Sequence, residues 1–265
     1  MFKMAFWVCY DHMGKLMAAN FVAAAVLTAA GLPALAALHS GDPALMLVAG
    51  APFGALALGV VLPVALAGCC HLCKELIETR DGSLRTFFEG VWLHGLRAAG
   101  LGLVVAAGAA VSGCAFWFYA VRIGAEHPLA GHALGALALW AFAGLTVCAL
   151  LALPAVVHKR AGPIAALRIG AALAADNPLM AAALAFHAGL IAAAAFAPPI
   201  LFFAAIAAAA ALMSSAYEML ARKYAALAAW REEGDTGRPF TLEFHDAEDD
   251  YLNRGFRDFL FPWKS

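Results

Sequence analysis

The sequence predicts an all-α membrane protein with six transmembrane helices, and three features support that class. Hydrophobic residues make up 64% of the 265 residues and charged residues 13%, far from the balance of a water-soluble domain. The mean hydropathy is +0.81. Apolar stretches of about twenty residues or more, long enough to cross a bilayer, alternate with short charged segments. We expect two cytoplasmic amphipathic helices and a cytoplasmic C-terminal tail to complete the architecture.

The apolar stretches divide into six expected spans: 18–38, 44–73, 98–122, 129–157, 179–197 and 199–220. At Pro198-Pro199 a single broken helix or a re-entrant pair is the alternative, but the length of the stretch favours two spans. Prolines at positions 33, 52, 63 and 154 are expected to kink or terminate their spans. Glycines at 50, 54, 131 and 135 have the spacing of close helix packing, within the chain or in a dimer.

The positions of Lys and Arg predict the orientation of the spans. Basic residues cluster before the first span, between the second and third, between the fourth and fifth, and after the sixth. Because cytoplasmic flanks retain positive charge, both termini are expected in the cytoplasm, and the chain in the inner membrane of a bacterium. The opposite loops are short and carry Asp42 and Glu126, with Arg122 at a helix end.

A cleaved signal peptide is the competing interpretation of the N-terminus. Lys15 precedes an apolar run, and residues 34–36 resemble a cleavage site. However, the segment before the run is too long for a simple basic leader. Phe2, Phe6 and Trp7 within it predict a stretch that lies at the membrane interface.

Each of the two longer cytoplasmic segments has a basic turn followed by an amphipathic pattern. In the first, Ser83 can cap a helix whose apolar residues include Phe87, Phe88 and Trp92. In the second, Gly162-Pro163 begins a helix and Asn177-Pro178 ends it. Both helices are expected at the inner interface. An internal duplication and the ordinary pattern of hairpin loops explain the similarity equally well.

Residues 1–220 are predicted to form the membrane domain and residues 221–265 a cytoplasmic tail. The tail should contain a helical extension of the last span, a turn-rich linker and an aromatic segment. We expect residues 251–265 to return to the inner surface and contact the bilayer or the helices at 84–93 and 164–174. Docking on a membrane or cytoplasmic partner is the alternative. The expected interfacial side chains of the tail are Phe256, Phe259, Phe261 and Trp263.

The string Cys69-Cys70-His71-Leu72-Cys73 is the most suggestive chemically, because thiolates and imidazoles bind zinc, copper and iron. It lacks a second pair of ligands. A helix would place Cys69 and Cys73 on one face and project Cys70 and His71 elsewhere. Metal binding, lipidation and redox chemistry are weaker candidates than plain packing.

Other polar residues give no clear catalytic pattern. His187 is an intramembrane ionisable residue, expected to be a neutral hydrogen-bonding group between helices rather than a proton-sensitive one. His39, Asp42, Glu126, His127 and His132 could converge outside the membrane as metal ligands. No phosphate loop, nucleophile elbow or pair of catalytic carboxylates occurs, so neither a catalytic site nor a cofactor is expected. The net charge of −1 gives no sign of nucleic-acid binding.

The order of several short motifs resembles the YesL family of bacterial membrane proteins, a domain of unknown function. The matching features lie in the first 220 residues: residues 11–16 with Asn20, Leu32-Pro33, Phe87-Phe88 with Trp92, and Leu167 through Asn177-Pro178. His94 departs from the pattern, in which Asn is expected there. The resemblance implies an integral membrane protein sometimes associated with carbohydrate uptake, and it supplies no catalytic residues.

These observations favour a non-enzymatic accessory or assembly factor, with the lipid bilayer as its first partner. A homo-oligomer is compatible with the small-residue motifs. A transport component for a sugar or another neutral solute is the alternative, because such a site can work without buried charge. A metal-dependent membrane enzyme using Cys and His is a third interpretation.

Overall fold

The computed structural model describes residues 1–232 and 250–254, and within them all regular elements are helices. Five helical runs are long and apolar enough to cross a membrane: Met13–Ser40, Pro43–Glu78, Leu84–Glu126, Pro128–Lys159 and Pro198–Arg231. A sixth arises only when Pro163–Asp176 and Pro178–Ala194, which meet at an angle of 113°, are taken as one broken span. The all-α membrane class is therefore confirmed.

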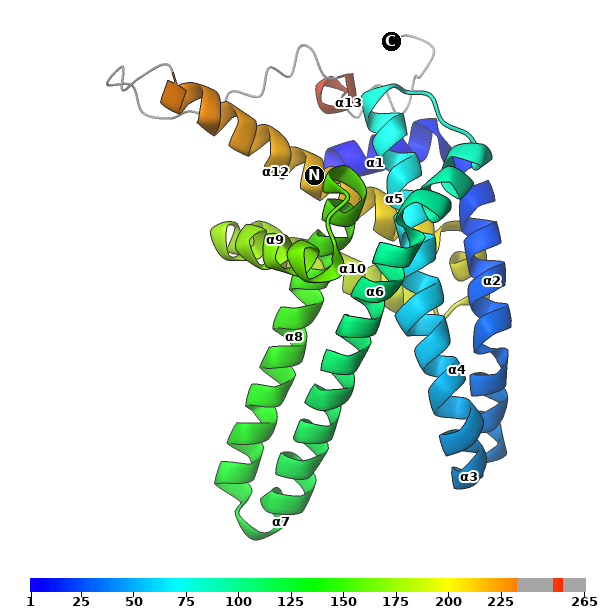
Figure 1. Ribbon diagram of the computed structural model, residues 1–265, viewed down its shortest axis with the longest axis vertical. Helices are drawn as coiled ribbons and strands as arrows, with labels where there is room; N and C mark the ends of the chain where they lie inside the picture. The colour runs from blue at the N-terminus through cyan, green and yellow to red at the C-terminus, as the bar shows by residue number, and fades with distance from the viewer. Residues whose placement is uncertain (233–249, 255–265) are drawn as a thin grey trace.

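Four of these runs form two antiparallel hairpins that diverge toward their tips (Figure 1). The first hairpin pairs α2 (Met13–Ser40) with the continuous run of α3 (Pro43–Leu45), α4 (Ala51–Leu56) and α5 (Leu62–Glu78). Gly41, with φ of +66°, makes the turn between them. The second hairpin pairs α6 (Leu84–Phe116), which continues to α7 (Gly124–Glu126), with α8 (Pro128–Lys159).

Small residues allow these helices to approach closely. In the first hairpin, a Cβ added at Gly50 would lie 3.5 Å from the Cβ of Ala37, and in the second, one at Gly135 would lie 3.0 Å from that of Ala120. Between the hairpins, a Cβ at Gly102 would lie only 2.1 Å from the carbonyl oxygen of Gly59. The expected close packing within the chain is thus confirmed at Gly135, whereas a Cβ at Gly50 would make only an ordinary van der Waals contact.

None of the four prolines expected to kink or terminate a span ends its helical run. Pro33 and Pro154 lie inside α2 and α8. Pro52 and Pro63 each follow a π-helical segment, Met46–Gly50 and Ala57–Val61, in otherwise continuous helix. Proline has no N–H to donate, and a π-helical turn is one way to accommodate the interrupted hydrogen-bond ladder.

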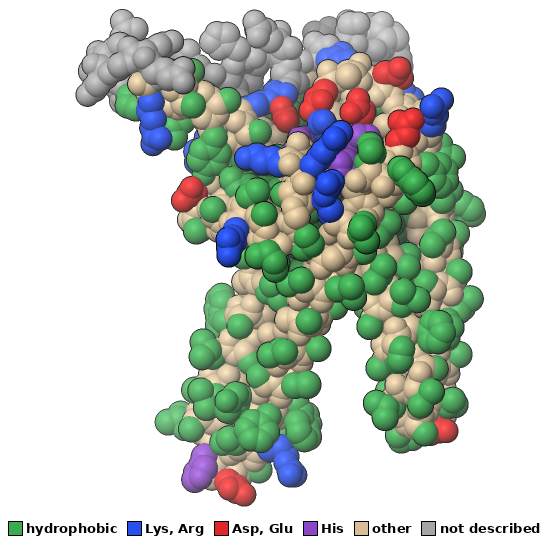
Figure 2. Space-filling model, viewed as in Figure 1, with side chains coloured by type: hydrophobic (Ala, Val, Ile, Leu, Met, Phe, Trp, Pro, Cys, Tyr) green, Lys and Arg blue, Asp and Glu red, His purple; other side chains and the backbone are tan. Residues whose placement is uncertain are grey.

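Charged side chains gather at one end of the molecule (Figure 2). We call this the charged end; it contains α1 (Phe2–Asp11) and the turns at 79–83 and 160–162. At the opposite end, the hairpin tips carry Asp42, Arg122 and Glu126. The N-terminus lies at the charged end (Figure 1).

Helix α12 (Ile206–Glu232) lies across the charged end and contacts both hairpins there (Figure 1). Its Ala207 N–H donates to Asn20 of α2, and its Ala210 carbonyl lies 3.9 Å from Cys70 Sγ of α5. Farther along, the Tyr217 ring lies 4.8 Å from the ring of His158 in α8. Asn20, Cys70 and His158 each lie within eight residues, or about 12 Å, of the terminus of their own helix that is at the charged end of the molecule.

The last two expected spans therefore follow paths that differ from the prediction. α10 (Pro178–Ala194) and α12 are joined through α11 (Pro198–Ile200) and the π-helical segment Leu201–Ala205. That segment is hydrogen-bonded to Asn20, which is twenty residues, or about 30 Å, from Ser40 at the hairpin tip. α10 and α12 lie near the charged end instead of running to the tips. The expected domain boundary at residue 220 falls inside α12, as the predicted helical extension requires.

The first expected amphipathic helix is not separate, because α6 runs unbroken from its capping box at Ser83 and Thr86 into the third span. Phe87 is consequently buried against Gly68 of α5 rather than interfacial. The second, α9 (Pro163–Asp176), is a separate helix as expected. Both preceding turns contain an arginine with positive φ, Arg80 and Arg160, followed two residues later by glycine.

Candidate functional site at the charged end

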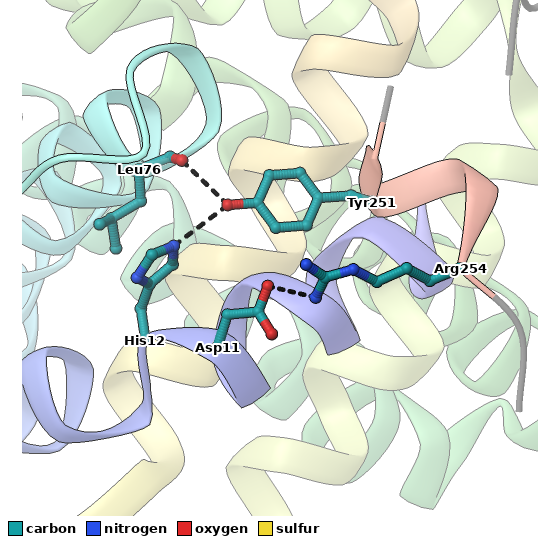
Figure 3. Close-up of polar contacts among 5 residues, drawn as sticks. All are labelled: Asp11, His12, Leu76, Tyr251 and Arg254. Atoms are coloured by element: carbon teal, nitrogen blue, oxygen red, sulfur yellow. Dashed lines mark hydrogen bonds and ion pairs between the residues drawn. The ribbon is translucent and has the colours of Figure 1, made fainter. Parts of the chain in front are cut away.

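The tail helix α13 (Asp250–Asn253) closes over the end of α5 (Figure 3). The Tyr251 side chain is only 3% exposed. Its hydroxyl donates to the Leu76 carbonyl at 3.1 Å and lies 3.1 Å from Nε2 of His12. The guanidinium of Arg80 lies over the Tyr251 ring, 5.2 Å from its centre. One tyrosine thus joins the tail, α5 and the start of α2.

Helix α1 holds the other side of α13. Arg254 pairs with the Asp11 carboxylate (Figure 3). Its guanidinium also stacks over the Trp7 ring, 5.2 Å from its centre. Lys3 donates a hydrogen bond to the Leu252 carbonyl. α1 is itself anchored, because Met4 and Val8 are fully buried. We call this set of contacts the tail clamp.

The tail clamp agrees only in part with the prediction that residues 251–265 return to the surface of the membrane domain. The described contacts are with α1 and α5, and the expected contacts with residues 84–93 and 164–174 are not among them. The expected interfacial residues Phe256, Phe259, Phe261 and Trp263 lie outside the described part of the chain.

The surroundings of His12 favour its neutral form. Burial lowers the pKa of His12, and the positive charges of Lys15, Arg80 and Arg254 lower it further, while Asp11 opposes them. A neutral ring with its proton on Nε2 can donate to the Tyr251 hydroxyl, which in turn donates to Leu76. Burial also raises the pKa of the nearby Cys9 thiol to about 11, so this thiol is unreactive at neutral pH.

Asn20 is a second polar centre and is fully buried. Its amide nitrogen donates to the carbonyls of Leu201 and Phe202, both at 2.7 Å, and its oxygen accepts from the Ala207 N–H at 2.9 Å. Three main-chain groups, two in the segment Leu201–Ala205 and one at the start of α12, are thereby satisfied in an apolar environment. This role explains the only amide side chain in the first span.

A third polar centre fixes the bend between α9 and α10. Asn177 donates to the Tyr224 hydroxyl at 3.0 Å and accepts a hydrogen bond from Lys223. The Tyr224 hydroxyl donates to the Asp176 carboxylate at 3.0 Å. The bend is therefore hydrogen-bonded to α12. The sequence Asp176-Asn177-Pro178 ends α9 and also makes this contact with α12.

The cysteine string is part of the core. Cys69, Cys70 and Cys73 are fully buried, and Cys70 faces α12. In residues 1–232 and 250–254, no group of three or more His, Cys, Asp or Glu side chains is arranged to hold a metal ion. His71 lies in the same string, and its ring lies 5.3 Å from the ring of His94.

His71 also borders a polar pocket of about 340 Å³ between the end of α5 and the start of α6. The other lining residues are Glu75, Thr79, Asp81, Gly82, Ser83, Thr86 and Glu89. Glu89 is paired with Arg85, and Asp81 accepts from the Gly82 N–H. Asp81 and Glu89 are thus engaged in local contacts of the turn and of α6.

A larger cavity of about 460 Å³ lies where the two hairpins separate below α12. Its lining comes from α4, the π-helical segment Ala57–Val61, α5, α6 and α8, together with Met213 of α12. Only Thr146 contributes a polar side chain, and that hydroxyl donates to the Phe142 carbonyl of its own helix. The cavity therefore suits an apolar occupant.

The remaining expected site residues do not converge. His187 bonds the Ala183 carbonyl of its own helix at 2.8 Å, so the expected bond between helices is replaced by a ring contact with Phe2 at 4.1 Å. Phe88 and Trp92 are exposed on α6, where membrane contact remains available. His39 and Asp42 belong to one hairpin tip, and Glu126, His127 and His132 to the other tip (Figure 1).

Sequence reasoning missed the residues that organise the charged end. The sequence pattern predicts only an interfacial tail for Tyr251 and Arg254, although a tyrosine and an arginine within five residues of an acidic run can also signal a specific contact. For Tyr224, which lies in an alanine-rich helix, the surrounding sequence does not predict a contact with another helix. Comparison with known protein families, curated proteins and solved structures found no match to this chain.

Proposed function

We propose that this protein is a non-enzymatic accessory or assembly factor of the bacterial inner membrane that receives a transmembrane helix of a partner between its two hairpins. The apolar cavity is the observation that supports this proposal. It lies between helices of spanning length, so its occupant comes from the bilayer interior or from another membrane protein.

The lining favours a helix as occupant. Seven of its residues are glycine or alanine: Gly54, Ala55, Gly59, Gly102, Ala106, Ala109 and Ala149. Small residues let helix backbones approach closely, and van der Waals packing of this kind drives helix association in lipid. A sugar would need hydroxyl or amide partners along its path, and the cavity offers only Thr146. The lining thus supports an accessory role over sugar transport.

The proposed orientation places the charged end in the cytoplasm, because basic flanks are retained there. The tail clamp would then lie on the cytoplasmic side, where α13 and the α5–α6 turn are accessible to soluble components. The membrane-facing cavity and the cytoplasmic clamp are joined through α5 and α12.

Photocrosslinking in native membranes tests the proposal. A photoreactive phenylalanine analogue at Ala109 or Ala149 should yield a discrete protein adduct after irradiation, since both positions line the cavity. The diverging parts of the two hairpins are called the legs. Matched probes at Val111 and Leu137, which lie on the legs and are 69% and 65% exposed, should yield mainly lipid adducts.

Lipid adducts alone at all four positions would contradict a helical partner. Sugar accumulation in vesicles reconstituted with the purified chain, abolished by bulky substitutions at Ala109 and Ala149, would replace the accessory role with transport.

A further inference from the structure

We infer that the junction of α6 and α9 binds the phosphate headgroup of an anionic glycerophospholipid through Arg97 and Arg160. The two arginines come from segments that touch. A Cβ added at Gly100 of α6 would lie 2.8 Å from Pro163, the first residue of α9. Arg97 and Arg160 each precede this contact by three residues, so both lie beside it toward the charged end.

Both guanidinium groups are available for a ligand. Arg97 and Arg160 are exposed, and within the described residues neither pairs with a carboxylate. By contrast, the exposed Arg85 on the same helix pairs with Glu89 at 2.9 Å. Arg160 adopts the left-handed conformation, with φ of 50°, which is costly for a residue other than glycine.

The core beneath the arginines holds an unsatisfied polar atom. His94 is 2% exposed, and its Nδ1 has no hydrogen-bond partner among the described residues. Arg97 and Arg160 both act electrostatically on this ring, so all three side chains share one locality. Buried polar atoms are nearly always satisfied by a protein group, water or ligand. A bound phosphate and the water it orders would complete this site.

The neighbouring surface favours a lipid over a free anion. On α6, Trp92 and Leu96 are about nine-tenths exposed, at 90% and 89%, and Ile164 of α9 is also exposed. Basic side chains, with acidic ones beside them, lie just above the apolar surface of the hairpins (Figure 2). Tryptophan and basic residues at such a boundary are typical of the headgroup level of a bilayer, and basic pockets between helices bind anionic headgroups.

Native mass spectrometry of the full chain in mild detergent tests this site. Phosphatidylglycerol and phosphatidylcholine with identical acyl chains are titrated separately. We expect wild-type protein to retain phosphatidylglycerol preferentially, and the Arg97→Gln, Arg160→Asn double variant to bind it roughly tenfold more weakly with unchanged phosphatidylcholine binding. Asparagine tolerates positive φ, so the turn at residue 160 is preserved.

The matched controls remove one exposed arginine elsewhere. Arg85→Gln and Arg122→Gln should leave phosphatidylglycerol retention unchanged, and circular dichroism should confirm that every variant is folded. Equal retention by the double variant, or no lipid preference in the wild type, would overturn the site. Displacement of the lipid by millimolar inorganic phosphate would identify a free anion as the ligand and overturn the lipid assignment.

Discussion

The hairpin legs and the charged end are held together by different kinds of contact. In the legs, glycine and alanine bring helices together, and described side-chain hydrogen bonds such as Thr146 to Phe142 stay within one helix. At the charged end, Asn20, Asn177 and Tyr251 each bond to a different helix. Close packing of small residues permits pairing, whereas directional hydrogen bonds in an apolar setting select one arrangement.

This difference indicates where the molecule is fixed and where it can accept a partner. The legs present large apolar side chains outward, among them Trp140 and Leu139, and lipid or a partner helix can replace one another there. The charged end tolerates less exchange, because each buried polar group needs its own partner. Four predictions test this contrast, from the largest expected effect to the smallest.

Replacing Asn20 with Leu should destabilise the protein most. The variant removes three hydrogen bonds and leaves main-chain groups of Leu201, Phe202 and Ala207 without that partner. We expect a loss of about 2–4 kcal/mol in the free energy of unfolding, measured by denaturant titration in micelles.

Thr28→Val on the same helix is the control and should change this free energy by much less. An Asn20→Leu variant as stable as Thr28→Val would mean that packing alone holds α12 across the charged end.

Replacing Gly102 with Ala should force the two hairpins apart. The added Cβ would meet the Gly59 carbonyl at 2.1 Å, and main chain cannot move as a flexible side chain can. We expect a loss of about 1–3 kcal/mol, read as a lower unfolding midpoint in micelles.

Gly113 lies on the same helix with nothing within 4 Å of its position, so Gly113→Ala should be neutral or slightly stabilising. Equal midpoints for the two variants would show that the hairpins do not depend on this contact.

Replacing Tyr251 with Phe should loosen the tail clamp without unfolding the spans. The variant removes the hydrogen bonds to Leu76 and His12 and retains the ring. A loss of about 0.5–1.5 kcal/mol should make amide hydrogen exchange in residues 250–254 several-fold faster. Tyr119→Phe near the other end serves as control, and unchanged exchange in the Tyr251 variant would argue against the clamp.

Acidification should weaken the tail clamp by the smallest amount. The docked state lowers the pKa of His12, so the undocked state binds a proton first when pH falls below the ordinary value of about 6.5. Docking is thus fully supported above that pH and declines as pH falls below it. A spin label on Leu252→Cys, with exposed Cys114 changed to Ser, should become more mobile over this range.

His12→Gln should flatten that pH response, while His39→Gln at the hairpin tip should preserve it. A response that survives His12→Gln would assign the titration to another group.

The apolar runs determined much of the fold. Uninterrupted hydrophobic length has one stable solution in a bilayer, a helix, so the all-α class and four of the spans could be predicted directly. The starts of α6 and α9 could also be predicted, because Ser83 and Gly162 are local helix-start signals. The helices against which α6 and α9 pack could not be predicted, since a cap specifies where a helix begins and not where it packs.

The sequence by itself determined helix content, the separation of charge between two ends, and the absence of a local catalytic motif. Only the tertiary structure decided that α12 lies across the charged end, because Asn20 bonds residues more than 180 positions away. It also decided that Tyr251 docks on Leu76 and that Arg97 and Arg160 share the surroundings of His94. Hydropathy is a property of each segment, whereas these contacts depend on the directional pairing of side chains far apart in the chain.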